Sequence, residues 1–243
     1  MIELPLASPV DQLWHALLDL SERLTVPWTL VRGQMVLLNA LEHSQAPLEP
    51  SQDGDVVAEL RADHGALIQA VRQLYALGFT LDSISTDGLA HRSARPAEPR
   101  PVLIDLLAPD GLGARANLTT SPPGRTVQVP GGTQALSRTE QVTVVHQGRH
   151  GQVPRPTLLG AIIIKAAAAD LPSPARHHRD LALLCSLVED PFSLSEQVTS
   201  KDRQRLRKAT VLADNTNPAW SLVPAAIRGQ GQITYRILAA ALP

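Results

Sequence analysis

The chain has 243 residues, of which 44% are hydrophobic, so it can bury the core of one large domain or of two small ones. Its 22 basic and 23 acidic side chains give a net charge of −1, which excludes a basic coat over the whole surface but not a local basic groove. The single cysteine, Cys185, excludes an internal disulfide framework and favours a reducing compartment.

The sequence predicts no contact with a membrane. The longest apolar run, residues 158–169, is too short to span a bilayer and contains Lys165. The first residues, MIELPLASPVD, lack the basic segment and apolar core of a signal peptide. We therefore predict a cytoplasmic protein without a membrane partner.

Residues 1–155 alternate between helix and strand patterns. Ser8 and Pro9 have the pattern of a helix start, and Asp63 and Gly78 bound a strongly amphipathic segment as N-cap and C-terminal glycine. The predicted helices cover residues 8–24, 33–44 and 63–78, and the predicted strands cover residues 27–33, 53–62, 90–94, 100–110, 125–129 and 139–148. This order predicts an α/β (α+β) fold with a small mixed sheet.

Every segment after about residue 155 has a helical pattern. The predicted helices cover residues 157–171, 174–188, 200–214, 218–227 and 233–242. The change of pattern between Pro154 and Pro156 predicts two domains, an α/β domain over residues 1–155 and a C-terminal helical domain over residues 156–243.

Three aspartates have the spacing of a metal site. Asp53 and Asp55 start an apolar, β-branched strand, and residues two apart on a strand share a face, so their carboxylates converge. Asp105 is a lone acid in the apolar strand VLIDLL and needs a cation or a hydrogen-bond donor if it is buried. Together the three acids predict a site for Mg²⁺ (or Mn²⁺) and for the phosphates of a nucleotide.

A tight turn at residues 31–34 lies between a predicted strand and a predicted helix. Backbone N–H groups of such a turn, with the positive end of the helix dipole, can hold a triphosphate. Gly33 also has the simpler interpretation of a turn glycine, and an Asp-x-Asp pair alone often only starts a strand. The order of strand, glycine turn, helix, Asp-x-Asp strand, helix and acid-bearing strand is what favours the nucleotide site.

Lys165 follows the letters GAIII and precedes four alanines, so it belongs to a helix that is predicted to be buried. A lysine there either extends its ammonium to the surface or faces a negative charge. A triphosphate at three carboxylates would supply that charge. His177 and His178 are predicted to face solvent or RNA, because no His and Cys ligand set for zinc accompanies them.

The motifs around the three acids resemble the nucleotidyltransferase fold that is shared with DNA polymerase β. That superfamily has a Gly-Gly or Gly-Ser turn, then an Asp-x-Asp pair, then a third acid on a later strand. The matching residues here are Gly33-Gln34 for the turn, Asp53 and Asp55 for the pair, Asp105 for the third acid, and Ser51 where the family often has Thr or Ser. The resemblance implies that Ser51 and the turn, Gly33 and Gln34, bind the nucleotide phosphates.

Residues 158–188 narrow the resemblance to AbiEii-type and MenT-type toxin nucleotidyltransferases. There a helical lysine is followed by a basic stretch and by an Arg-Asp or Lys-Asp pair, and Lys165, Arg176, Arg179 and Asp180 occupy these positions. The resemblance implies that Lys165 and Arg179 contact the triphosphate and that Asp180 supports the site. It covers about residues 25–190 and reaches none of the later residues.

Two residues depart from the pattern. Gln34 replaces the small residue that lets a phosphate approach the turn, and Gly54 stands between the two acids where a β-branched or aliphatic residue is usual. Both departures leave open an altered choice of nucleotide or a weakened enzyme.

The resemblance implies a metal-dependent transfer of NMP from an NTP to an acceptor hydroxyl, with release of pyrophosphate. Asp53 and Asp55 would hold the metal ions, and Asp105 would hold one metal and act as general base. MenT-like toxins imply a tRNA 3′ end as acceptor, and an antitoxin protein as a further partner. The open alternatives are a small-molecule or protein acceptor, a catalytically degenerate nucleotide-binding relative that acts through a partner, and a purely structural protein.

Overall fold

The computed structural model describes residues 1–5, 10–46, 51–61 and 63–240. The strands are β1 (Ile2–Glu3), β2 (Trp28–Leu30), β3 (Asp53–Ala58), β4 (Thr80–Leu81), β5 (Arg92–Arg95), β6 (Val102–Pro109), β7 (Thr119–Ser121), β8 (Gly124–Arg125), β9 (Gln128–Val129), β10 (Thr139–His146) and β11 (Arg149–Pro156). The helices are α1 (Asp11–Arg23), α2 (Arg32–Glu42), α3 (Ala66–Ala76), α4 (Gly132–Ser137), α5 (Leu158–Ala167), α6 (Pro174–Ser186), α7 (Pro191–Glu196), α8 (Ser200–Leu206), the 3₁₀ helix η1 (Arg207–Ala213), α9 (Pro218–Ser221) and α10 (Ala225–Ala239). The predicted α/β fold with a helical C-terminal region is confirmed.

The larger sheet brings the two acid-bearing strands together. Its order is β2-β3-β6-β5-β4, and β9 pairs with the end of β6. Strands β3 and β6 are parallel, whereas β2, β5 and β4 each run antiparallel to their neighbour on this path. Both central strands are buried apolar runs, with Val56, Val57 and Leu107 fully covered.

A second sheet has the order β1-β10-β11. Its hairpin turn places Gln147 at φ 49° and Gly148 at φ 79°, and two positive φ angles are what a tight two-residue hairpin needs. Our sequence interpretation missed β11, because Pro154 and Pro156 make an edge strand look like a domain linker. Strands β7 and β8 form a separate two-stranded hairpin.

Two predicted helix starts differ from the structure. The expected start of the first helix, at Ser8 and Pro9, lies outside the described residues. The prediction of Asp63 as N-cap of the third helix is wrong, because that helix begins at Ala66 after Gly65. The Asp63 carboxylate instead accepts a hydrogen bond from the Gly65 N–H at 2.7 Å, in a turn before the helix.

The helical region is more segmented than the sequence pattern indicates. The predicted helix over residues 200–214 divides into α8 and η1, where Ala209 leaves the helical conformation with φ −99° and ψ 35°. The predicted helix over residues 218–227 also divides, because α10 begins only after Pro224. The short α4 was not predicted at all.

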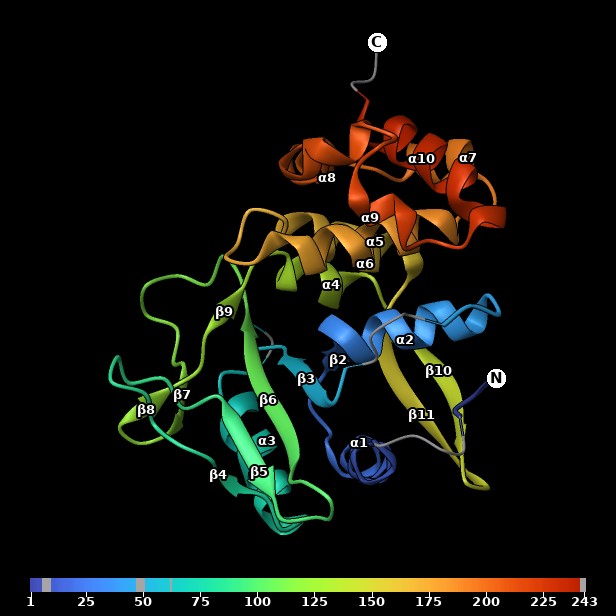
Figure 1. Cartoon of the computed structure of the whole chain (residues 1–243). Helices are drawn as coiled ribbons and strands as arrows, with labels where there is room; N and C mark the ends of the chain where they lie inside the picture. Colours follow the sequence, from blue (N-terminus) through green and yellow to red (C-terminus); the bar gives the residue numbers. More distant parts are fainter. Residues whose placement is uncertain (6–9, 47–50, 62, 241–243) are drawn as a thin grey trace.

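Figure 1 shows helices α5 to α10 as a helical layer over the sheets, in which α5 and α6 lie next to the sheet part and α7, α8 and α10 lie above them. Helices α2 and α4 lie between the two parts, and α1 and α3 lie on the far side. One hydrophobic cluster joins Val57 and Leu107 of the sheet to Ile162 and Leu184 of the helical layer. The two predicted domains therefore share a core, and the boundary at residue 155 remains a prediction. Within the described ranges, no helix is both long and apolar enough to cross a bilayer.

Candidate functional site

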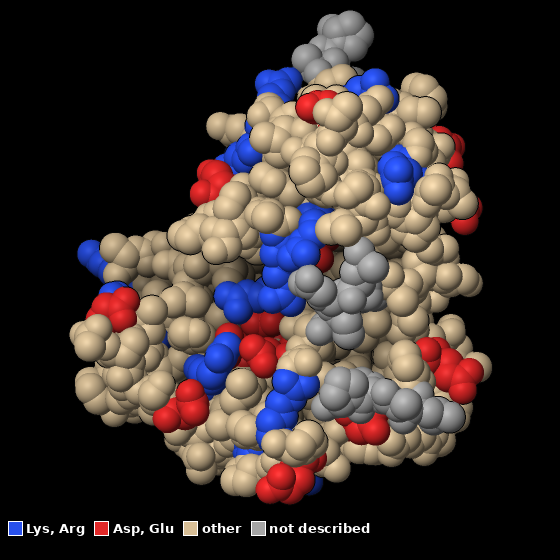
Figure 2. Space-filling model, viewed as in Figure 1, with Lys and Arg blue, Asp and Glu red and all other residues tan. Residues whose placement is uncertain are grey.

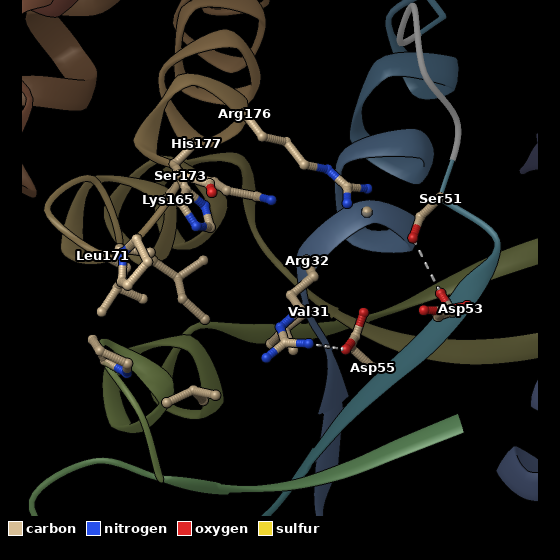
Figure 3. Close-up of a pocket in the computed structure, with 16 residues that line it drawn as sticks. Val31, Arg32, Ser51, Asp53, Asp55, Lys165, Leu171, Ser173, Arg176 and His177 are labelled. Atoms are coloured by element: carbon tan, nitrogen blue, oxygen red, sulfur yellow. Dashed lines mark hydrogen bonds and ion pairs between the residues drawn. The ribbon is translucent and has the colours of Figure 1, made fainter. Parts of the chain in front are cut away.

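A cleft of about 330 Å³ opens between the sheet part and the helical layer. One wall comes from the start of α2 and of β3, and includes Arg32, Gly33 and Ser51 (Figure 3). The facing wall comes from α5 and α6, and includes Lys165 and Arg176. On this face of the molecule, Figure 2 shows basic side chains gathered between the two parts, with acidic side chains beside them. The cleft is therefore a mixed-charge site built from distant segments.

The three predicted acids meet at the first wall. Asp55 and Asp105 are direct partners in the parallel register of β3 and β6, so both side chains leave the sheet on the same face. Asp53 lies two residues before Asp55 and shares that face. Asp55 is 3% exposed and Asp105 is 1% exposed, whereas Asp53 is partly open to the cleft.

Two guanidinium groups bind this acid cluster. Nη1 of Arg32 lies 2.8 Å from Oδ1 of Asp55 and 3.4 Å from Oδ2 of Asp105. Arg92, which opposes Asp105 across β5 and β6, donates to it from Nε at 2.8 Å and from Nη2 at 3.1 Å, and its Nη2 lies 3.3 Å from Oδ2 of Asp53. Each of the three carboxylates thus has a guanidinium partner, which answers the need for positive charge beside buried acids.

The charge state of the cluster is finely balanced. Burial raises the pKa of Asp55 to about 7, while Arg32 opposes that rise. The neighbouring Asp105 and Asp53 carboxylates push the same pKa upward, and the ammonium of Lys165 pushes it downward. The hydrogen bond to Asp105 raises the pKa of Arg92, which stays fully charged. Asp55 consequently depends on a nearby cation to be ionised at neutral pH.

The donor set of Asp53, Asp55 and Asp105 fits a hard divalent cation, because Mg²⁺ and Mn²⁺ prefer carboxylate oxygens. Guanidinium groups nevertheless hold these oxygens, so an ion could bind only where Arg32 or Arg92 moves away. In the described part of the chain, no three His, Cys, Asp or Glu side chains are arranged as a ready metal centre. The metal site stays a prediction.

The glycine turn fixes the distance between α2 and β3. A Cβ at Gly33 would lie 2.0 Å from the Cβ of Ser51, so only glycine allows this approach. Gln34 does not line the cleft: its side chain is buried and its Nε2 donates to the Ser51 carbonyl at 2.8 Å. The predicted contact of Gln34 with phosphate is therefore replaced by a role in holding Ser51, which does line the cleft.

The facing wall contains a buried lysine. Lys165 is 4% exposed, lines the cleft, and its Nζ lies 2.6 Å from Oδ2 of Asp180. The ammonium thus faces negative charge instead of extending to the surface, which is the second of the two predicted alternatives. Asp180 anchors Lys165 from outside the cleft lining, and Arg179 lies on the same helix, also outside that lining.

Three residues of the cleft and of the acid cluster have surroundings that the sequence did not reveal. His177 was expected to face solvent or RNA; it is half-buried and lines the cleft, where burial and the nearby Lys165 lower its pKa to about 4. Arg32 precedes the turn glycine and was overlooked, although its position beside Gly33 was a usable signal. Arg92 was not singled out from the sequence, because its pairing with Asp105 depends on the order of the strands.

Comparisons with known proteins give weak likenesses only. No protein-family model matches the chain, and no curated protein matches it. A crystal structure of ANT(2")-Ia in complex with adenylyl-2"-tobramycin aligns with a TM-score of 0.45 at 14% identity, over 84% of this chain and 99% of that chain. A solution structure of the antibiotic-resistance factor ANT(2'')-Ia aligns with a TM-score of 0.41 at 13% identity, over 83% and 89%. Similarities at this level do not establish a shared activity.

The structure brings most predicted site residues to one place. The cleft lining includes Gly33, Ser51, Asp53, Asp55 and Lys165. Asp105 belongs to the same acid cluster and contacts Arg32 and Arg92, but it does not line the cleft. An arrangement of acids on one wall and cations on the other can bind a phosphorylated ligand and place a carboxylate beside it.

Proposed function

We propose that this protein is a nucleotidyltransferase, which transfers a nucleoside monophosphate from an NTP to an acceptor hydroxyl and releases pyrophosphate. The observation that carries the proposal is the register of β3 and β6, which aligns Asp55 with Asp105 on the wall opposite Lys165. A triphosphate needs cations around its oxygens, and the attacking hydroxyl needs a carboxylate beside it. The resemblance of the turn, the Asp-x-Asp pair and the third acid to the DNA polymerase β superfamily supports the same reaction.

The transfer step follows from the chemistry of phosphates. The acceptor oxygen attacks the α-phosphorus in line, the bond from that phosphorus to the pyrophosphate oxygen breaks, and pyrophosphate leaves. Lys165, Arg176 and Arg32 bind the negative charge of the triphosphate. Asp53 lines the cleft with a side chain that is 35% exposed, so it is better placed than the buried Asp105 to take the hydroxyl proton.

The remaining predicted residues have supporting roles in this proposal. Mg²⁺ or Mn²⁺ held by Asp53, Asp55 and Asp105 would supply further neutralisation of phosphate charge. Ser51 lies at the turn where β- and γ-phosphates would approach α2, and Asp180 holds Lys165 in position. The division into a nucleotidyltransferase domain over residues 1–155 and a helical domain over residues 156–243 assigns one wall of the cleft mainly to each.

For the acceptor we propose RNA, with the 3′ end of tRNA as the first candidate, and a toxin role regulated by an antitoxin protein. The support is the sequence resemblance to AbiEii-type and MenT-type enzymes, together with the basic side chains gathered along the face that contains the cleft (Figure 2). A small molecule such as an aminoglycoside, or a protein hydroxyl, is the alternative acceptor.

A second candidate function is nucleotide binding without transfer. The observation that favours it is the ion pairing of all three acids with Arg32 and Arg92, which fills the positions where metal ions would bind. Such a protein would hold an NTP in the cleft and act through a partner.

One experiment separates the two candidates. Each α-³²P-labelled NTP is incubated with the purified protein, Mg²⁺ or Mn²⁺ and, in separate reactions, total tRNA, an aminoglycoside or a protein mixture. Label is followed in the acceptor, because the α-phosphorus stays with the transferred nucleotide, and the unlabelled pyrophosphate is measured by a coupled phosphatase assay. We expect labelled RNA from the wild type and none from Asp55→Asn, whereas Asp63→Asn, a carboxylate outside the cleft, serves as the matched control. Nucleotide binding with no label in RNA, in an aminoglycoside or in protein would favour the second candidate.

A further inference from the structure

The two guanidinium groups of the acid cluster are held very differently. Arg92 is bonded to Asp105 through both Nε and Nη2, and it extends from the neighbouring strand in register with that acid. Arg32 makes both of its carboxylate contacts through Nη1 alone, at 2.8 Å to Asp55 and 3.4 Å to Asp105. Its side chain is 45% exposed and lines the cleft. Arg32 is therefore the more easily displaced of the two.

Asp55 needs a cation beside it to stay ionised, whichever way the cleft is filled. It is almost completely buried, its neighbours Asp53 and Asp105 are also carboxylates, and Arg32 is the guanidinium bound to it. A buried carboxylate that loses its counter-ion must either take up a proton or gain a replacement cation. A divalent cation is such a replacement, because it takes carboxylate oxygens and carries twice the charge.

A triphosphate in the cleft would compete for Arg32 from the other side. Phosphate oxygens attract a guanidinium through short, charge-assisted and often paired hydrogen bonds. Lys165 and Arg176 on the facing wall would hold the same ligand, so that Arg32 would turn from Asp55 toward the phosphates without leaving the cleft (Figure 3). The oxygen vacated by Arg32 is then open to the metal ion.

We propose that Arg32 is a built-in counter-ion that competes with a divalent cation for Asp55, so that the metal binds tightly only after a nucleotide has drawn Arg32 away. This inference rests on the proposed nucleotidyltransferase function. It makes the binding of nucleotide and of metal mutually dependent, because each ligand favours the same displaced position of one side chain. Arg32 acts as a positioning residue that keeps the acid cluster closed to metal in the absence of nucleotide.

The test is the titration of Mn²⁺ alone, without nucleotide, into wild-type protein and variants, followed by calorimetry and by the electron paramagnetic resonance signal of free Mn²⁺. We expect weak binding to the wild type and an affinity about tenfold or more higher in Arg32→Gly. Glycine suits this position because Arg32 has a φ of 54°, so the variant relieves backbone strain and should fold; Arg32→Ala is the second variant. Circular dichroism checks the fold of both.

Two controls identify the origin of any gain. Arg176→Ala removes a cation from the same cleft that forms no ion pair with the three acids, and it should change Mn²⁺ affinity by less than about twofold. Arg32→Gly combined with Asp55→Asn should abolish the gain. Equal gains in Arg32→Gly and Arg176→Ala, or no gain in either Arg32 variant, would overturn the inference.

The proposed role of Arg32 and the proposed transferase function can be overturned separately. Tight Mn²⁺ binding to Arg32→Gly that depends on Asp55, with no transfer of label to any acceptor, would support the competition and overturn the transferase proposal. If the wild type transfers label but Mn²⁺ binding does not depend on Arg32, the transferase proposal stands and the proposed competition between Arg32 and the metal is overturned.

Discussion

The two ends of helix α2 carry ion pairs with opposite patterns of burial. At its start, the carboxylate of Asp55 is buried and its partner Arg32 is 45% exposed. At its end, the guanidinium of Arg155 is buried, at 1% exposure, and its partner Glu42 is 43% exposed. A buried anion with an exposed cation can exchange that cation for a ligand from the cleft, whereas a buried cation on a strand has no such access. The comparison separates a binding site from a structural ion pair on one helix.

The largest effect is expected at the start of α2. Asp105→Asn removes the bidentate acceptor of Arg92 and one acceptor of Arg32, so nucleotidyl transfer should fall by about 10²–10³-fold. The free energy of unfolding should change little. The substitution removes one of three carboxylates that repel one another, and the guanidinium groups of Arg32 and Arg92 keep Asp55 and Asp53 as partners. Transfer rates and urea unfolding curves measure both quantities. If the variant kept more than about a tenth of the wild-type rate, Asp105 would have no direct role in transfer.

At the end of α2 the effect should fall on stability. Arg155→Met leaves the side-chain oxygen of buried Asn39 without its donor and unpairs Glu42 and Glu140, so we expect a loss of about 2–3 kcal/mol in the free energy of unfolding. Arg149→Met, a partly exposed arginine on the same strand, should cost under about 1 kcal/mol. Transfer per folded molecule should not change. A selective loss of transfer in Arg155→Met would show that the end of α2 also contributes to the site and is not only structural.

The glycine turn offers a finer test of the first end. Gly33→Ala places a Cβ against Ser51, which must shift together with the start of β3, and the cost should be about 1–3 kcal/mol. The KM for NTP should rise as well, because Ser51 and Asp53 move with the turn. Gly229→Ala in α10, where a Cβ meets no atom within 4 Å, is the control and should be neutral or slightly stabilising. Unchanged unfolding and KM in Gly33→Ala would contradict the close approach.

The smallest effect concerns His177 on the facing wall. Its folded pKa of about 4 lies below the unfolded value, so the unfolded chain binds more protons between these values, and the stability that depends on neutral His177 is lost as pH falls from about 6.5 to 4. After allowance for solvent screening, the wild type should lose about 1 kcal/mol more than His177→Gln over this window. Urea unfolding of both proteins at pH 7 and pH 4.5 measures the difference. An identical pH dependence would show that the imidazole is not desolvated.

Local sequence determined much of the fold and part of the site. The β-branched run after Asp53, the apolar strand around Asp105 and the helical pattern after Pro156 each depend on neighbouring residues, and the structure has elements at all three. The convergence of Asp53 and Asp55 also follows from strand alternation alone. Strand β11 was missed, because prolines hide an edge strand that only its pairing with β10 reveals.

Only the tertiary structure decided what the acids contact. Asp55 lies 23 residues from Arg32 in the sequence, and Asp105 lies 73 residues from it, so no local pattern links them. Their contact depends on the parallel register of β3 and β6 and on the packing of α2 over that edge. Likewise, the helical layer decides that Lys165 and His177 face the cleft, since a helix pattern gives the buried side but not the charge opposite it.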